Sequence, residues 1–139
     1  MITGFFPGNL HLYEIALTHK SASISLPDGS SVNNERLEYL GDAILTAIIA
    51  DYLYLRFPDN DEGFLTQLRS KIIKRKQLNR LAYQIGMLPL LILNTRQNQQ
   101  KENILGNAFE ALVGAIYLDK GYYKTRKFVI NKILERHFN

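Results

Sequence analysis

Three acidic residues at the start of a long apolar stretch have a spacing that suits cation binding. Glu35, Glu38 and Asp42 are separated by three and then four residues, so on a helix their carboxylates share one face. Like charges at this spacing repel each other, and the apolar residues that follow predict that the helix continues into the protein core. We therefore expect a positively charged group beside this face.

A second polar pair lies in an otherwise apolar stretch further along the chain. Asn107 and Glu110 are three residues apart and share one face of a predicted helix. Gly41 and Gly114 give each of the two predicted helices a small residue that permits close packing. If the helices cross at these glycines, four oxygen-bearing side chains meet, as in the metal sites of helix bundles. The four are Glu38, Asp42, Asn107 and Glu110.

The side chains of this predicted site favour a hard metal ion. Because the chain has no cysteine and no histidine near these residues, the oxygen ligands favour Mg²⁺ or Mn²⁺ over Zn²⁺. The alternative is that the acids cap helices and pair with basic neighbours such as Arg36, Arg69 and Lys71. The context favours the metal site, because both clusters lie within apolar runs and each has a glycine at packing distance.

The elements that hold these residues are predicted to be helices, with no convincing sheet, so we expect an all-α fold. Asn33 and Asn34 are candidate N-caps for the helix that carries the first cluster, and Pro58 helps to end it. Loops are expected at 21–32 and in the polar run NTRQNQQKEN, which is the best candidate for a mobile segment. Helices are expected near 10–18, 34–57, 64–85 (one bent helix or two), 104–118 and 122–138.

The composition is that of one ordinary globular domain over residues 1–139. The absence of cysteine excludes a disulfide scaffold and a thiolate metal site, and it suits a cytoplasmic protein. The first residues lack the pattern of a secretory signal, and the longest apolar run is far below the ~20 residues of a membrane span, so no membrane partner is expected. A net charge of +4 permits a polyanionic partner but is weak support by itself.

The blocks that carry these residues resemble a known family. The run NNERLEYLGDAIL at 33–45 resembles the signature of the ribonuclease III catalytic domain, which is long and specific. Three further blocks resemble the family's other motifs in the same order, so the likeness covers nearly the whole chain. They are ALTHKS at 16–21, EGFLTQLRS at 62–70 and GNAFEALVGAIYLD at 106–119.

The resemblance implies a homodimeric helical bundle with metal sites along a cleft that holds an RNA duplex. By motif, Glu38, Asp42 and Glu110 resemble direct metal ligands, and Glu35 and Glu62 resemble accessory acids near the scissile phosphates. The implied activity is metal-dependent hydrolysis of double-stranded RNA to 5′-phosphate and 3′-hydroxyl ends, in RNA processing. Mg²⁺ is the implied cofactor, and Mn²⁺ is expected to substitute for it.

Four single residues carry separate expectations. Tyr39 matches the aromatic position that inserts into the partner subunit; the alternative is an ordinary core aromatic. Asn107 stands where the family usually has an aspartate ligand, and its amide oxygen can coordinate Mg²⁺ but supplies no charge. His19, like His137, is expected to be structural or exposed rather than a general base.

The RNA-binding surface is expected on the densest basic cluster of the chain. An A-form duplex hides its base edges, so the grip must be on its phosphates and 2′-hydroxyls. For each basic residue the alternative is an ordinary solvated helix face. The candidates for backbone contact are Arg69, Lys71, Lys74, Arg75, Lys76 and Arg80.

Two other functions remain open at this point. The double-stranded-RNA-binding domain that commonly follows in the family has no counterpart in this sequence, and we expect a longer natural protein to carry it. The first alternative is a miniature stand-alone enzyme of ribosomal RNA maturation. The second is a non-catalytic RNA-binding relative, for which Asn107 is the only support in the sequence.

Overall fold

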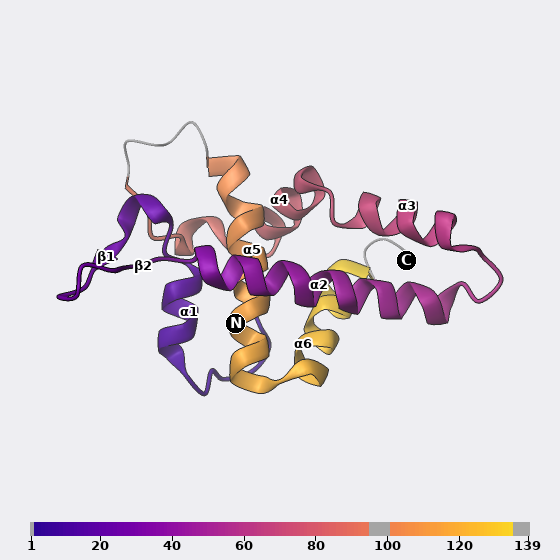
Figure 1. Ribbon diagram of the computed structural model, residues 1–139, viewed down its shortest axis with the longest axis horizontal. Coiled ribbons are helices and arrows are strands. Elements are labelled where there is room, and N and C mark those ends of the chain that lie inside the picture. Colours follow the sequence, from indigo (N-terminus) through magenta and orange to yellow (C-terminus); the bar gives the residue numbers. More distant parts are fainter. Residues whose placement is uncertain (1, 95–100, 135–139) are drawn as a thin grey trace.

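The centre of the protein is a pair of long helices that cross each other. The computed structural model describes residues 2–94 and 101–134. Helix α2 spans Glu35–Arg56 and helix α5 spans Lys101–Lys120, and Figure 1 shows them crossing near the middle of the molecule. Both helices bury large apolar side chains against each other and the surrounding elements. The most buried of these include Leu45, Ile48, Ile49, Phe109, Val113 and Ile116.

The two central helices touch through their main chains at the crossing point. A Cβ atom on Gly41 would overlap the carbonyl oxygen of Glu110, and one on Gly114 would lie 2.5 Å from the carbonyl oxygen of Leu37. Contacts between Cβ and main-chain atoms this short do not occur in folded proteins, so only glycine fits at either position. The close packing expected from the two glycines is therefore confirmed.

Shorter helices surround this pair. Helices α1, Leu10–Ala16, and α6, Tyr122–Val129, pack against α5, and a turn of π-helix, Ile130–Leu134, follows α6. Helix α3, Glu62–Ile72, packs against α2, whereas α4, Arg75–Gln84, packs against α5. The stretch predicted as one bent helix or two is therefore two helices, separated at Ile73 and Lys74. The mostly helical architecture matches the prediction.

The expectation of no sheet is wrong in one detail. Strands β1, Ile24–Ser25, and β2, Ser31–Val32, form a small antiparallel hairpin within the segment predicted to be a loop. Its turn is held by Asp28, whose carboxylate accepts hydrogen bonds from the amide and hydroxyl of Ser30 at 2.9 and 2.6 Å. Strands of two residues are too short to show the alternation by which a strand is predicted.

Glycines follow two of the helices, close to the helix ends predicted at residues 85 and 118. Gly86 and Gly121, which follow α4 and α5, both have a φ of +88°, a conformation that side-chain-bearing residues rarely adopt. The predicted end of the last helix, beyond residue 134, lies outside the described residues, as does the central part of the predicted mobile loop, residues 95–100. In the described ranges, no helix is long and apolar enough to cross a membrane.

Candidate active site: an acidic cleft at the helix crossing

The crossing of α2 and α5 forms the floor of a cleft of about 570 Å³. The four oxygen-bearing side chains expected to meet do line one cleft, and Glu35 and Tyr39 line it with them. Residues from the α1–α2 connection and from α4 complete the walls. The lining residues are His19, Lys20, Asn34, Glu35, Glu38, Tyr39, Asp42, Arg75, Asn107 and Glu110.

Two asparagines fix the start of α2 and so set the position of its acids. Asn34 is buried; its amide N–H donates to the carbonyl of Thr18 at 2.9 Å, and its side chain donates to the carbonyl of Ala16 at 3.2 Å. The side-chain oxygen of Asn33 accepts a hydrogen bond from the amide of Glu35 at 2.9 Å. Of the two predicted caps, Asn33 therefore makes the side-chain bond, and Asn34 ties the start of α2 to the end of α1 and to the residue Thr18 just after it.

Glu110 is the most buried carboxyl group of the cleft, with 5% of its surface exposed. Burial is the main cause that raises the pKa of this group to about 8, and the neighbouring Asp42 contributes to the same rise. Burial also raises the pKa of Glu38, with Glu35 and Asp42 adding to the effect and Arg75 opposing it. When the pKa of a carboxyl group is raised in this way, its surroundings lack the positive charge that would stabilise the ionised form.

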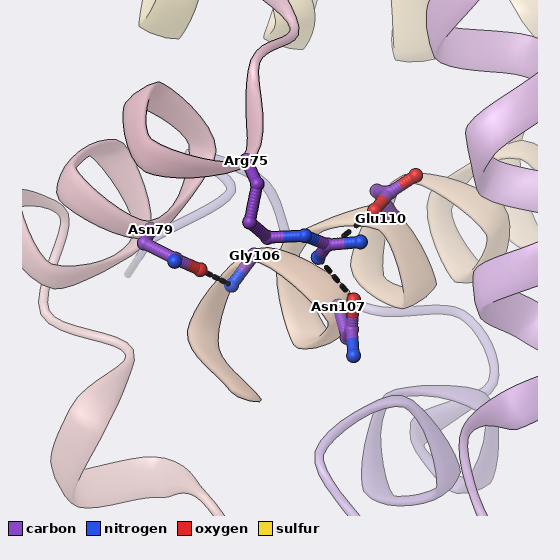
Figure 2. A network of polar contacts seen from close by, with 5 residues as sticks. All are labelled: Arg75, Asn79, Gly106, Asn107 and Glu110. Carbon is purple, nitrogen blue, oxygen red and sulfur yellow. Dashed lines mark hydrogen bonds and ion pairs between the residues drawn. The ribbon is translucent and has the colours of Figure 1, made fainter. Parts of the chain in front are cut away.

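One arginine supplies part of that positive charge. Arg75, the first residue of α4, donates through Nη1 to the side-chain oxygen of Asn107, and the same nitrogen lies 3.5 Å from Oε1 of Glu110 (Figure 2). Beside it, the side-chain oxygen of Asn79 accepts a hydrogen bond of 2.7 Å from the amide of Gly106. The expected cationic group is thus present, but it is Arg75 and not one of the neighbours named from the sequence.

The donor set of the cleft suits a hard divalent ion. Carboxylates and an amide oxygen are the ligands that Mg²⁺ and Mn²⁺ prefer, and the raised pKa values of Glu38 and Glu110 show that further positive charge would be stabilising here. Within the described ranges, no three His, Cys, Asp or Glu side chains stand close enough together to hold an ion as they are. Metal binding would therefore require these side chains to converge, with Arg75 already beside them.

Comparison with known proteins identifies the family of the chain. Residues 9–137 match the protein family described as Ribonuclease-III-like. The chain belongs to the ribonuclease III family. It is 49% identical over 138 residues to ribonuclease 3 of Bacteroides thetaiotaomicron, covering 99% of this chain and 44% of that protein. Against ribonuclease 3 of Azobacteroides pseudotrichonymphae it is 52% identical over 136 residues, covering 98% of this chain and 52% of that protein.

Two solved structures share the fold. The nuclease domain of ribonuclease III from Campylobacter jejuni matches with a TM-score of 0.85 and 32% identity, over 99% of this chain and 93% of that chain. Dicer from Pichia stipitis matches with a TM-score of 0.71 and 26% identity, over 96% of this chain and 57% of that chain. The chain spans about half the length of the two curated ribonuclease 3 relatives above and corresponds to the nuclease domain.

The places of two further residues assigned by family motif, Tyr39 and Glu62, differ from each other. Tyr39 lies at the cleft but is 82% exposed, so it is not a core aromatic of this chain. Glu62 lies at the start of α3, outside the cleft, in a separate pocket with Tyr54, Leu55 and other residues between α2 and α3. The cleft of a single chain therefore contains Glu35 together with the four predicted metal ligands, but it does not contain Glu62.

The basic cluster divides into separate groups. Arg69 lines the α2–α3 pocket with Glu62, and Lys71 is an exposed residue of α3. Lys74, Lys76 and Arg80 line a surface pocket along α4 together with Tyr83. Arg75 belongs to this pocket and to the acidic cleft, so it joins the two.

Three cleft residues were not expected as site residues: His19, Lys20 and Asn34. The ring nitrogen Nδ1 of His19 accepts a hydrogen bond of 3.1 Å from the amide of Ser21, and burial lowers the pKa of His19. The ring is therefore neutral near pH 7 and carries its proton on Nε2. The structural role expected of His19 agrees with these contacts, and the block that holds it, at 16–21, was the available signal for its place at the cleft.

Proposed function

We propose that this chain is the nuclease domain of an endonuclease that hydrolyses the phosphodiester bonds of double-stranded RNA, in RNA processing. The observation that carries the proposal is the burial of Glu110 beside Asp42 and Glu38 at the crossing of two helices. Such a concentration of carboxyl groups is destabilising in the absence of a cation, and its presence in a cleft is typical of a functional site. Membership of the ribonuclease III family supports the substrate and the reaction.

The residues proposed to hold Mg²⁺, or Mn²⁺ in its place, are Glu38, Asp42, Asn107 and Glu110. When bound, such an ion lowers the pKa of water and neutralises charge on the phosphoryl oxygens. Glu35, which is exposed at the cleft, is the accessory acid of the same chain. Water is the nucleophile, so no serine or cysteine nucleophile is required, and the products carry 5′-phosphate and 3′-hydroxyl ends.

The duplex is proposed to lie across the acidic cleft and the basic pocket beside it. Lys74, Lys76 and Arg80 supply charges for the phosphate backbone, and Lys20 supplies another on the cleft wall. Because these contacts are electrostatic, RNA affinity should fall steeply with added salt. An affinity that does not change with salt would contradict this assignment.

The working form is proposed to be a homodimer. Tyr39 stands exposed near the beginning of α2, and a pocket of about 590 Å³ that includes Tyr54, Leu55 and Phe57 lies near its end. The two features are about 22 Å apart along the helix. Two copies with antiparallel α2 helices would place each Tyr39 at the other copy's pocket, as a two-fold axis requires. The Campylobacter jejuni nuclease domain has a region involved in dimer formation.

The same pairing gives Glu62 a place near a cleft. Glu62 lines the pocket proposed to receive Tyr39, and Tyr39 in turn lines the acidic cleft. In the dimer, Glu62 of one copy would therefore approach the cleft of the other. This arrangement accounts for an acid that matches the family motif yet lies outside its own cleft.

The catalytic proposal is tested by duplex RNA cleavage with and without Mg²⁺. Glu110→Gln keeps the size of the side chain but removes its charge, and it should reduce the cleavage rate more than about 100-fold while the protein stays folded. Glu14→Gln, which changes an exposed acid of α1, is the matched control and should cleave normally. If the Glu110→Gln variant cleaved RNA at the wild-type rate, the active site would have been assigned to the wrong residues.

The dimer is tested by light scattering at micromolar concentration. Tyr39→Ala should shift the mass toward that of the monomer, because it removes the exposed aromatic side chain of the proposed contact. Tyr123→Ala is the matched control, since Tyr123 is 85% exposed on α6 and lines neither the cleft nor the pocket of the proposed contact. A monomeric wild-type protein would contradict the proposed dimer.

A non-catalytic RNA-binding relative is the second candidate. The contact that favours it is the one between Arg75 and Asn107, because an arginine occupies part of the cleft and the residue it binds carries no charge. This candidate predicts salt-sensitive binding of duplex RNA with no cleavage at any Mg²⁺ or Mn²⁺ concentration. A miniature stand-alone enzyme remains a variant of the first candidate, with structured ribosomal RNA precursors as its substrate.

A further inference from the structure

The path of the Arg75 side chain depends on a glycine. Helix α4 begins at Arg75, and the side chain extends over Gly106 of α5 toward the acidic cleft (Figure 2). A Cβ atom on Gly106 would lie 3.1 Å from Nη1 of Arg75 and 2.6 Å from the side-chain oxygen of Asn79. The absence of a side chain at Gly106 therefore leaves room for the arginine to reach Asn107 and Glu110.

The guanidinium group contacts two of the proposed metal ligands at once. It donates to Asn107, lies 3.5 Å from the Glu110 carboxylate, and lines the same cleft as Glu38. Its side chain is 47% exposed, whereas that of Glu110 is 6% exposed. The arginine can therefore leave for solvent, while the carboxylate cannot without disturbing the helix crossing.

We propose that Arg75 is the internal counter-cation of the acidic cleft: it orients Asn107 and Glu110 in the metal-free protein, and a divalent ion must compete with it for them. This inference rests on the proposed function, since it concerns the metal of that site. In the RNA-free protein Arg75 is a positioning residue, because there it acts on the proposed metal ligands. It sets how much metal the site requires.

The identity of residue 107 fits this role. An aspartate at this position would form an ion pair with Arg75, which adds the attraction between opposite charges to the hydrogen bond that the arginine already donates. The amide of Asn107 accepts the same hydrogen bond without adding a negative charge, so the arginine is held but is easier to displace. The departure of Asn107 from the family pattern and the presence of Arg75 in the cleft are therefore parts of one arrangement.

The displaced arginine has a place to go. Arg75 also lines the basic pocket along α4, where Lys74, Lys76 and Arg80 already gather positive charge. A guanidinium group that turns toward this pocket would meet the phosphate backbone of a bound duplex. Binding of RNA and of metal should consequently assist each other, because RNA draws Arg75 away from the metal ligands.

The inference is tested by Mn²⁺ titration of the RNA-free protein, followed by calorimetry or electron paramagnetic resonance. Arg75→Gln should bind Mn²⁺ about tenfold more tightly than wild type, because a competing unit charge is gone from the ligand shell. The same variant should have a lower thermal midpoint when free of metal. Arg75→Lys keeps the charge but loses the planar guanidinium group, so its Mn²⁺ affinity should fall between those of wild type and Arg75→Gln. It replaces Arg75→Gln in the test if the glutamine variant folds poorly.

A matched control separates local competition from net charge. Arg80→Gln removes the same charge from the same helix, but Arg80 does not line the acidic cleft. Its Mn²⁺ affinity should equal that of wild type. A tenfold gain in the Arg80→Gln variant as well would show that overall charge, and not the contact of Arg75, sets the affinity, and the inference would be wrong.

Asn107→Asp gives an independent arm through non-additivity. With Arg75 present, the new carboxylate pairs with the arginine, so the gain in Mn²⁺ affinity should be small. In the Arg75→Gln background the same substitution should raise Mn²⁺ affinity by about tenfold, because nothing then neutralises the added charge. Equal gains in the two backgrounds would overturn the inference.

The outcomes distinguish this inference from the proposed function. Unchanged or weaker Mn²⁺ binding by Arg75→Gln overturns the inference, even if the wild-type protein cleaves RNA as proposed. Tighter binding by that variant supports the inference, even if no RNA is cleaved and the proposed function fails. A wild-type protein that binds no Mn²⁺ at all contradicts both.

Discussion

Helix α5 carries two acids with opposite environments. Glu110 lies at the crossing with α2, where it is buried beside other carboxyl groups. Asp119 lies nine residues later, near the end of the helix, and accepts three hydrogen bonds. Its donors are the amides of Gly8 and Asn9, both at 3.0 Å, and the hydroxyl of Tyr13 at 2.7 Å.

The pKa values of the two acids move in opposite directions for these reasons. Burial raises the pKa of Glu110 to about 8, whereas the hydrogen bond from Tyr13 lowers the pKa of Asp119. The Asp119 carboxylate accepts hydrogen bonds from its neighbours, and these bonds attach the N-terminal segment to the core. Glu110 is an acid whose surroundings favour the arrival of a cation. The partners of a carboxyl group, more than its position in an apolar helix, therefore indicate whether it serves structure or chemistry.

The largest effect on stability is expected from a substitution where α2 crosses α5, beside Glu110. Gly41→Ala places a methyl group against the main chain of Glu110, which neither helix can move away from locally, so unfolding free energy should fall by about 4 kcal/mol or more. Chemical denaturation of the metal-free protein measures this loss. In contrast, an added Cβ at Gly63 would meet only the Asp61 side chain, at 3.6 Å, so Gly63→Ala should be neutral or slightly stabilising. Similar stability of the two variants would rule out the close crossing.

A smaller effect is expected in the pH dependence of stability, to which Glu110 should contribute. Because its folded-state pKa is raised from 4.5 to about 8, the metal-free protein should be most stable below pH 4.5, as far as this group is concerned, and should lose that stability as pH rises through about 8. After allowance for relaxation around the charge, we expect a loss of roughly 2 kcal/mol. Glu110→Gln should remove this slope. A slope that persists in the variant would assign the titration to another group.

The smallest effect concerns Asp119, with the opposite sign of pH dependence. Asp119→Asn keeps one acceptor oxygen but loses the charge, so it should cost about 1 kcal/mol at neutral pH. Because the folded-state pKa of Asp119 is lowered from 3.8, its contribution is present above that value and is lost as pH falls through the lower folded pKa. The stability difference between wild type and variant should therefore shrink in acid.

Activity measurements sharpen the contrast between the two acids. Asp119→Asn should leave the cleavage rate and Mn²⁺ affinity unchanged at temperatures where the protein is folded, because Asp119 does not line the acidic cleft. Loss of either property in a fully folded Asp119→Asn protein would mean that the two ends of α5 are coupled.

The sequence predicted much of this arrangement because local spacing determines it. The intervals between Glu38 and Asp42, and between Asn107 and Glu110, place each pair on one helix face, and the two glycines predict where the helices meet. These inferences need only helical geometry and the size of a side chain. The assignment of Glu38, Asp42, Asn107 and Glu110 as metal ligands stays a prediction.

Other features depend on contacts between distant segments, which spacing does not encode. Arg75 is 32 residues from Asn107 in the chain, and only the packing of α4 against α5 brings it into the cleft. From the sequence it belonged to a run of basic residues with no sign that one of them turns inward. Glu62 is the opposite case, since its motif suggested a place near the other acids and the packing of α3 puts it in a different pocket.

The contact between Gly41 and Gly114 has a consequence for how this protein can change over evolutionary time. The separation of α2 and α5 at the cleft is set by main-chain atoms, not by the volumes of the apolar side chains around them. Substitutions among residues such as Leu45 or Phe109 can therefore accumulate while the acids on the two helices keep their distance. A lineage that retained only the two glycines and the polar cleft residues could diverge widely elsewhere and still inherit the same geometry.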